Sequence, residues 1–233
     1  MLVGEGCVAL PGLSGGDIAD ITMQAPESVD DVILTLSRSP EASIFISAKH
    51  RANPIPLTAN SPAFADTVTA FVRQFLKLSP DAQTRSRFLW AVPSSAGKPA
   101  TCDLPSALNS HREDGSTTLC RFLGGRSERE RKAIGALIEH AKGVWKKETG
   151  KTPLDDEIRD LLRMVYIAVY DFELGIQHDQ LAESDIRAHI VAEAKHAKRV
   201  WKEIKQLLNR ADQRGLCVTR SGGSVWPELE SFR

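Results

Sequence analysis

The order of hydrophobic and polar positions along this chain changes from short β-type runs to helical spacing. Residues 29–36 and 44–51 each form a short run with many β-branched and apolar residues, and the Ser-Arg-Ser-Pro-Glu-Ala segment between them has a loop composition. We therefore predict two strands over these ranges, joined as a hairpin. The segment 17–23 is a further strand candidate.

After a loop with three prolines at 52–62, the apolar residues recur at helical intervals. Pro62 suits the first position of a helix, which we expect to run to about residue 78. The apolar segment 87–92 then predicts a buried strand, followed by a loop to about residue 103. The order strand, strand, helix, strand favours a small α/β sandwich.

The second half has mainly helical patterns. Ser127 and Glu130 form a capping box, which predicts a helix to Glu148 that stops at Gly150. We expect a short helix near 155–163, a strand near 165–173 that returns to the sheet, a long helix over 184–214, and a last strand-like piece at 216–219. The predicted fold class is α/β, a mixed sheet flanked by helices. Its parts are a core at 1–115, a helical part at 116–215 and a tail at 216–233.

The 233 residues have a formal net charge of zero, but the charges are unevenly distributed. Residues 1–60 contain three Lys/Arg and seven Asp/Glu, whereas residues 121–151 contain nine Lys/Arg and four Asp/Glu. The basic segment suits a surface that binds a polyanion. It suits a solvated helix face equally well, and the sequence leaves both interpretations open.

Other features of the sequence narrow the functional classes. The four cysteines are isolated, no apolar run approaches the length of a membrane span, and the first residues do not resemble a signal peptide. We therefore expect a cytoplasmic protein with no membrane partner. Residues 140–146 are echoed at 196–202 as His-Ala-Lys-x-Val-Trp-Lys, and we interpret this echo as two helices that pack alike.

The predicted hairpin also carries candidate chemistry. Asp30 and Asp31 lie in the first run and Lys49 lies late in the second. Phosphodiester hydrolysis needs a cation that neutralises the phosphate and lowers the pKa of an attacking water. Mg²⁺ prefers oxygen ligands, often only one or two carboxylates. Because side chains alternate along a strand, Ser47 and Lys49 are expected on the same face.

These residues resemble the PD-(D/E)xK nuclease superfamily, and more narrowly the endonuclease-like domain of bacterial anti-phage effectors, which commonly precedes a STAND-type NTPase or sensor module. The resemblance implies a restriction-endonuclease-like fold and a DNA endonuclease in antiviral defence that uses Mg²⁺ or Mn²⁺. It implies Asp31 as metal ligand with Asp30 as its neighbour or substitute, Lys49 as catalytic lysine, and His50 and Arg51 as nucleic-acid contacts. The implied partners are DNA and either a sensor or NTPase module or further copies of the chain.

Ser47 departs from the pattern of this superfamily, which has Glu, Asp or Gln two residues before the lysine. A hydroxyl is a weak, neutral ligand, so the missing charge would have to come from another carboxylate, such as Glu5, Asp17, Asp20 or Glu27. Alternatively, Asp30 and Asp31 cap a hairpin and Lys49 is a surface residue, while His50 and Arg51 are edge-strand charges that block aggregation. The competing hypothesis is therefore a non-catalytic interaction or regulatory domain that keeps the nuclease fold.

Overall fold

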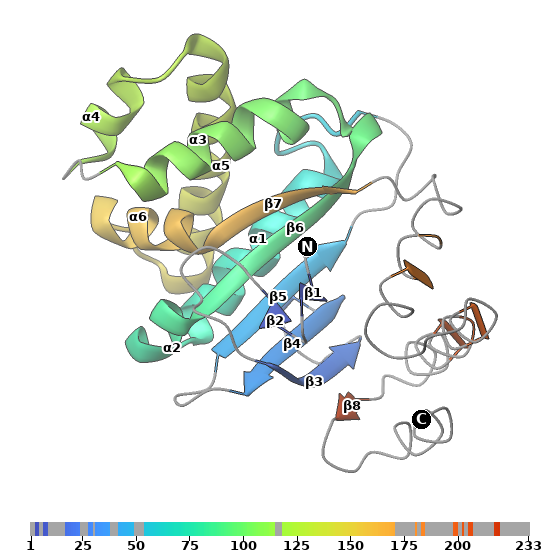
Figure 1. Cartoon of the computed structure of the whole chain (residues 1–233). Coiled ribbons are helices and arrows are strands. Elements are labelled where there is room, and N and C mark those ends of the chain that lie inside the picture. Colours follow the sequence, from blue (N-terminus) through green and yellow to red (C-terminus); the bar gives the residue numbers. More distant parts are fainter. Residues whose placement is uncertain are drawn as a thin grey trace. The chain divides into compact units, whose positions relative to one another are not determined.

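The computed structural model describes residues 3–4, 7–8, 17–23, 28–29, 31–37, 42–48, 54–114 and 118–170, with a few further residues between 180 and 219 (Figure 1). The chain forms two compact units. Unit 1 comprises residues 1–25, 31–43 and 171–233, and unit 2 comprises residues 26–30 and 44–170. The domain boundaries expected from the sequence stay a prediction.

The described part of unit 1 consists of antiparallel strand pairs. β3 pairs with β2, β4 and β8, and β1 pairs with β2. The register of β3 with β4 shifts between Ile18 and Asp20. The strands predicted at 17–23 and near 216–219 are confirmed. The strands of this unit are β1 (Val3–Gly4), β2 (Cys7–Val8), β3 (Asp17–Met23), β4 (Val32–Ser37) and β8 (Cys217–Thr219).

Unit 2 combines three strands with a larger set of helices. The strands β5, β6 and β7 are neighbours in that order, although the first two residues of β5 are assigned to unit 1. The elements are β5 (Ala42–Ala48), α1 (Pro62–Lys77), α2 (Pro80–Arg85), β6 (Ser86–Pro93), η1 (Ser94–Ala96), η2 (Pro99–Asp103), α3 (Leu104–Glu113), α4 (Leu119–Gly124), α5 (Glu128–Thr149), α6 (Asp155–Met164) and β7 (Val165–Tyr170).

β6 and β7 form a parallel pair in which Phe88 is opposite Val165 and Pro93 is opposite Tyr170. Parallel neighbours need a long crossover connection, and the helical segment between these two strands supplies it. The strand predicted near 165–173 is therefore present as β7. The α/β class, the presence of both parallel and antiparallel pairing, and helices beside the strands are confirmed. The restriction-endonuclease-like topology stays a prediction.

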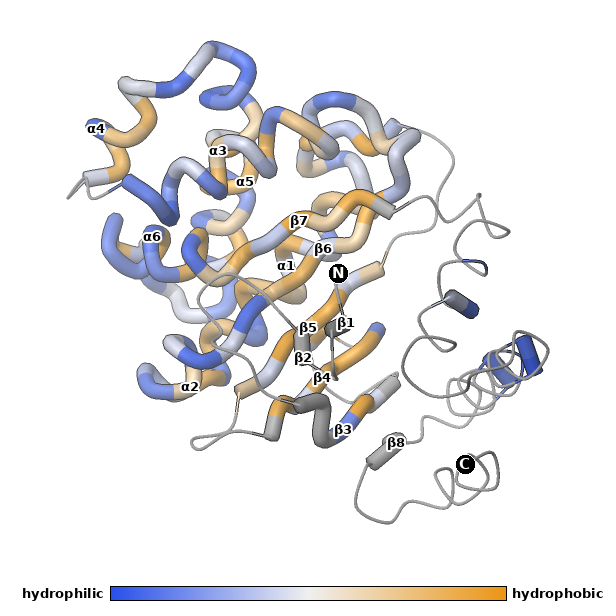
Figure 2. Tube along the Cα trace, in the orientation of Figure 1, coloured by the Kyte–Doolittle hydropathy of each residue, from blue (hydrophilic) through white to orange (hydrophobic). Residues whose placement is uncertain are grey.

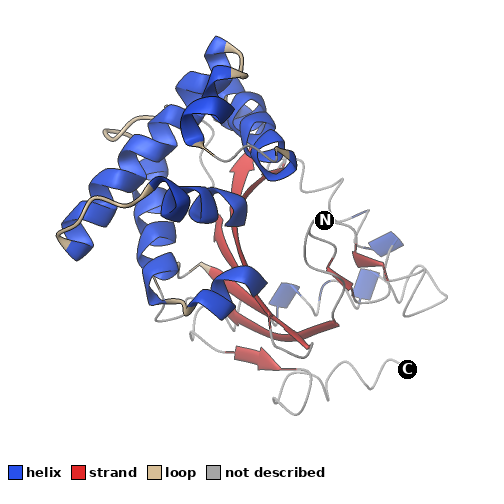
Figure 3. Ribbon diagram, turned by 90° about the vertical axis from the view of Figure 1, so that its left-hand side faces the viewer, coloured by secondary structure: helices blue, strands red, loops and turns tan. Residues whose placement is uncertain are grey.

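Aromatic contacts join the layers of unit 2. The ring of Phe71 on α1 stacks on Phe88 of β6 at 5.1 Å between centroids. One turn further along the same face of α1, Phe75 contacts Trp145 of α5 at 5.5 Å. Helix α1 thus contacts both β6 and α5, and Figure 3 shows the helices in blue beside the strands in red. Hydrophobic colours run along β6 in Figure 2, whereas the outer turns of the helices are hydrophilic.

The helix ends follow the local sequence. The Ser127 hydroxyl accepts from the Glu130 N–H while the Glu130 carboxylate accepts from the Ser127 N–H, which completes the predicted capping box of α5. Gly150 ends α5 with φ 73°, a left-handed conformation that glycine adopts without steric cost. The predicted helices at 62–78, 127–148 and near 155–163 are confirmed as α1, α5 and α6.

Three helices were not predicted from the sequence. They are α2, α3 and α4. In addition, the prediction of a loop to about residue 103 is wrong for 94–96 and 99–103, which form the short helices η1 and η2. The predicted helix over 184–214 and the second copy of the His-Ala-Lys echo fall almost entirely outside the described residues. Within the described residues, no helix has the length and apolarity needed to cross a membrane.

Candidate functional site

Two of the six residues predicted for the nuclease site are described. Asp31 is a half-exposed bend residue directly before β4 of unit 1, and Ser47 is a buried residue near the end of β5 in unit 2. The residues Asp30, Lys49, His50 and Arg51 lie outside the described residues. The expected convergence of Asp31, Ser47 and Lys49 therefore stays a prediction.

Ser47 is held by helix α1. Its side chain is 3% exposed, and its hydroxyl lies 3.3 Å from the Thr67 hydroxyl. Thr67 uses its own proton to donate to the carbonyl of Ala63 at 2.8 Å. A carbonyl can only accept, so Ser47 must be the donor to Thr67. The proton of the Ser47 hydroxyl therefore points to α1, and its oxygen lone pairs point elsewhere.

The same face of α1 also holds the segment before Asp31. The N–H of Ser28 donates to the side-chain oxygen of Gln74 at 3.2 Å, and the Gln74 side chain is 3% exposed. Thr67 and Gln74 are seven residues apart, which is close to two helical turns and about 10.5 Å along the axis. One face of α1 therefore anchors two chain segments, one that leads into Asp31 and one that ends just before Lys49.

The described residues contain no group of three His, Cys, Asp or Glu side chains that could hold a metal ion. Of the four alternative carboxylates considered from the sequence, Asp17 and Asp20 lie in β3, where they pair with Ser37 and Thr35 of β4. Glu5 and Glu27 lie outside the described residues. The Mg²⁺ or Mn²⁺ site stays a prediction.

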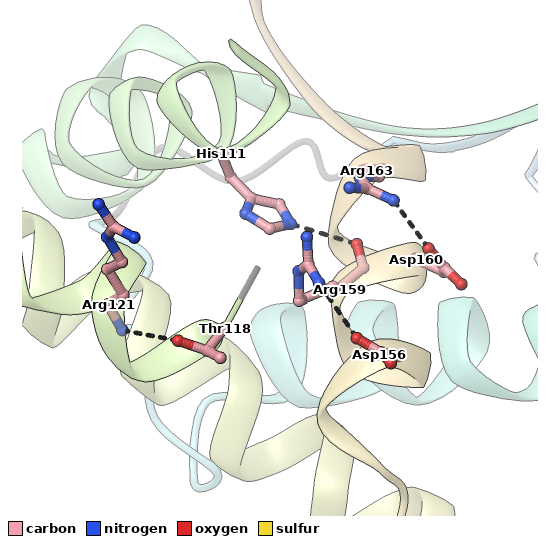
Figure 4. Close-up of polar contacts among 7 residues, drawn as sticks. All are labelled: His111, Thr118, Arg121, Asp156, Arg159, Asp160 and Arg163. Carbon is pink, nitrogen blue, oxygen red and sulfur yellow. Dashed lines mark hydrogen bonds and ion pairs between the residues drawn. The ribbon is translucent and has the colours of Figure 1, made fainter. Parts of the chain in front are cut away.

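A buried histidine marks a second polar region, between α3 and α6. The His111 side chain is 2% exposed, its ring meets Phe122 edge-on at 4.8 Å, and its Nε2 lies 3.2 Å from the carbonyl oxygen of Arg159. Because that carbonyl accepts, Nε2 carries the proton. Nδ1 is buried and has no hydrogen-bond partner among the described residues. Figure 4 shows the ring directed at the α6 backbone.

Burial and the nearby arginines both lower the pKa of His111. Burial is the main cause that lowers the pKa of His111, and the positive charges of Arg163, Arg159 and Arg112 lower this pKa further. The hydrogen bond to the Arg159 carbonyl opposes the shift. On α6, the mostly buried Arg159 pairs with the exposed Asp156, and the exposed Arg163 pairs with Asp160, each at 3.1 Å. The cluster is a helix-packing contact with a positive potential.

A cavity of about 650 Å³ lies between α1, α5 and the loop at 57–59. His140 lines it and lies 3.2 Å from the carbonyl oxygen of Ala65. At one end, Nε and Nη2 of Arg73 both contact one carboxylate oxygen of Glu148 at 2.8 Å. Its volume is in the range of small-molecule pockets, but opposite charges line it without a clear preference for one ligand class.

His111, Thr67 and Gln74 were not predicted as functional residues from the sequence. A signal was present for α1, because Thr67, Phe71 and Gln74 follow the i, i+4, i+7 spacing of its buried face. Polar side chains at buried positions need hydrogen-bond partners, and such partners often come from another element. Reading Thr67 and Gln74 as core-facing polar residues would have predicted that α1 anchors other segments.

We compared the chain with models of protein families, with curated proteins and with solved structures, and no match was found in any of the three. The functional interpretation therefore depends on the chain's own residues.

Proposed function

We propose that the chain is a metal-dependent DNA endonuclease-like domain of a bacterial defence system. The observation that supports this proposal best is the double anchorage on α1. Gln74 holds the segment that leads into Asp31, and Thr67 holds the strand that ends before Lys49. Both anchored residues, Ser28 and Ser47, belong to unit 2, and a functional site is more precise when such a rigid element supports it. The same proposal includes a cytoplasmic setting and a sensor module, an NTPase module or further copies of the chain as partners.

In this proposal, Asp31 is the carboxylate ligand, assisted or replaced by Asp30, and Lys49 steadies the attacking water and the charge that develops on the phosphate. A bound Mg²⁺ or Mn²⁺ would neutralise the phosphate and lower the pKa of water. Ser47 donates its proton to Thr67, so its oxygen is left as an acceptor for a metal-bound water. His50 and Arg51 would contact the phosphate backbone.

A second candidate is a non-catalytic interaction domain that keeps the nuclease fold. The observation that favours it is the state of Ser47, which is neutral, buried and already bonded to Thr67. A hydroxyl in this setting contributes no charge to a cation site. This candidate predicts that the chain binds its partner equally well with and without divalent cations.

Incubation of the protein with supercoiled plasmid and Mg²⁺ or Mn²⁺ tests the proposal. We expect the wild type to nick the plasmid and Lys49→Ala to lose about 100-fold in rate, as is typical when one group that stabilises transition-state charge is removed. Lys98→Ala, at an exposed lysine of unit 2, is the matched control and should retain the wild-type rate. Equal nicking by wild type and Lys49→Ala, or no nicking by either, would favour the interaction domain.

A further inference from the structure

The outward side of α5 carries a row of cations. At 100° per residue, its basic positions occupy an arc opposite the buried stripe that includes Ile134, Leu137 and Ala141. All of these basic side chains are exposed or half-exposed. They are Arg129, Arg131, Lys132, Lys142, Lys146 and Lys147.

Two acids of this segment are bound away from the row. Glu130 accepts from the hydroxyls of Ser106 at 2.5 Å and Ser127 at 2.8 Å, and these bonds lower the pKa of Glu130. Glu148 is held by Arg73 of α1. Both carboxylates are therefore engaged by neighbours that are not part of the row.

Only part of the row is neutralised. Lys132 pairs with Glu128 at 2.7 Å, and Lys142 pairs with Asp155 at 3.5 Å. Among the described residues, no ion pair within 4.0 Å involves Arg129, Arg131, Lys146 or Lys147, although Glu128 also attracts Arg131 electrostatically. Glu139 is the remaining acid on that side of the helix. Four cations are thus left against one carboxylate.

The helix dipole does not account for this distribution. Cations in the last turn of a helix are favourable, which explains Lys146 and Lys147, but cations in the first turn oppose the dipole. Arg129 and Arg131 lie in or next to the first turn of α5. The two pairs are about 16 residues apart, or about 24 Å along the axis, less than the roughly 34–36 Å of one turn of duplex DNA. Arg129 and Arg131 lie about 160° apart around the axis and so mark the two edges of the basic arc, while both positions along the helix lie within the length of one turn of a duplex.

We propose that the outer face of α5 binds the phosphate backbone of double-stranded DNA. The identity of the polyanion rests on the function proposed above, whereas the surface itself rests on the charges of α5. Arg129 and Arg131 offer planar forks for phosphate oxygens, and Lys146 and Lys147 act as point charges. The contacts carry no base information, so binding is independent of sequence and strongly dependent on salt.

Fluorescence anisotropy with a labelled 30-base-pair duplex in EDTA, over a series of NaCl concentrations, tests this surface without any need for cleavage. The variant Arg129→Gln/Arg131→Gln/Lys146→Gln/Lys147→Gln keeps good helix formers. Because each phosphate contact contributes about −0.9 to the slope of log K against log[salt], its slope should be smaller by about 3.6, and its Kd near 100 mM NaCl should rise at least ~100-fold. Circular dichroism checks that α5 remains folded.

The matched controls are Lys98→Gln, which removes one exposed cation of unit 2 outside α5, and Lys146→Gln, which removes one cation of the row. Lys146→Gln should lower the slope by about 0.9 and Lys98→Gln should leave it unchanged. The proposal is overturned if the wild type does not bind duplex DNA, if the quadruple variant binds like the wild type, or if anionic vesicles or single-stranded RNA bind in preference. If the protein binds DNA but does not nick it, the α5 surface is upheld and the nuclease proposal fails. If the quadruple variant nicks DNA at the wild-type rate, the nuclease proposal is upheld and the α5 surface fails.

Discussion

Ser47 and His111 are both buried polar residues of unit 2, but their surroundings differ. The hydroxyl of Ser47 donates to Thr67, which in turn donates to Ala63, so this contact has a complete chain of hydrogen bonds. His111 donates to one carbonyl and leaves Nδ1 buried without a partner among the described residues. Ser47 was singled out from the sequence, and His111 was not.

The comparison shows that the residue in the recognisable sequence motif, Ser47, is not the residue whose burial is most costly, which is His111. Buried polar groups in native proteins are nearly always paired, so an unpaired ring nitrogen among arginines is the more costly arrangement. It persists because the ring packs against Phe122 and bonds to α6. Ser47, in contrast, lies in a strand, and its hydroxyl has a hydrogen-bond partner in Thr67.

The largest expected effect is on His111. His111→Ala removes the contact with Phe122 and leaves the Arg159 carbonyl without this donor, and we expect a loss of about 2–4 kcal/mol in the free energy of unfolding, measured by urea denaturation. His111→Phe keeps an aromatic ring of similar size and should lose only about 1–2 kcal/mol. If His111→Ala costs less than about 0.5 kcal/mol, a typical surface value, the packing role of His111 is wrong.

The elements of unit 2 that the sequence predicted are those with strong local signals. α1 has Pro62 and an apolar stripe, α5 has a capping box and Gly150, and β7 is β-branched and aromatic. The helix α3 was missed because its segment has a weak pattern, with Pro105, Asn109 and two serines among few apolar residues. Its position depends on packing against α5 and α6, which no local rule contains.

The candidate site was predictable only in part. The sequence identified Ser47 as the departure from the nuclease pattern, but its contact with Thr67 joins residues 20 positions apart. The contact between Ser28 and Gln74 spans 46 positions. Such pairings depend on how a strand and a segment lie on α1, and alternation along one strand cannot specify them. The charges of α5 were visible in the sequence, but their arrangement on one side needed the helix and its buried stripe.

The free energy of unfolding should depend on pH through His111 but not through Ser47. The pKa of His111 is lowered in the folded protein, so the unfolded chain binds a proton more readily. Stability from the neutral ring is therefore present above the ordinary pKa of 6.5 and is lost as the pH falls toward the folded value. The difference in unfolding free energy between wild type and His111→Phe should shrink below pH 6.5, by at most about 1.4 kcal/mol per pH unit. Urea denaturation from pH 5 to 8 measures it.

Ser47→Ala is the control for this titration, because Ser47 has no ionisable group. The difference between wild type and Ser47→Ala should be constant over the same pH range. All three proteins share every other ionisable group, so the comparison isolates the change at position 111. A constant difference between wild type and His111→Phe would contradict the depressed pKa.

The smallest expected effects lie at the Ser47 contact, where the direction of the hydrogen bond can be tested. Ser47→Ala removes a donor and leaves Thr67 bonded to Ala63, so we expect a loss of about 0.5 kcal/mol. Thr67→Val leaves the buried Ser47 hydroxyl without its acceptor and should cost about 1 kcal/mol, whereas Thr67→Ser should restore most of it. In the double variant Ser47→Ala/Thr67→Val no donor is stranded, so its loss should be smaller than the sum of the two single losses. Strict additivity in urea denaturation would show that the two hydroxyls do not bond, and Ser47 would then be free to serve another partner.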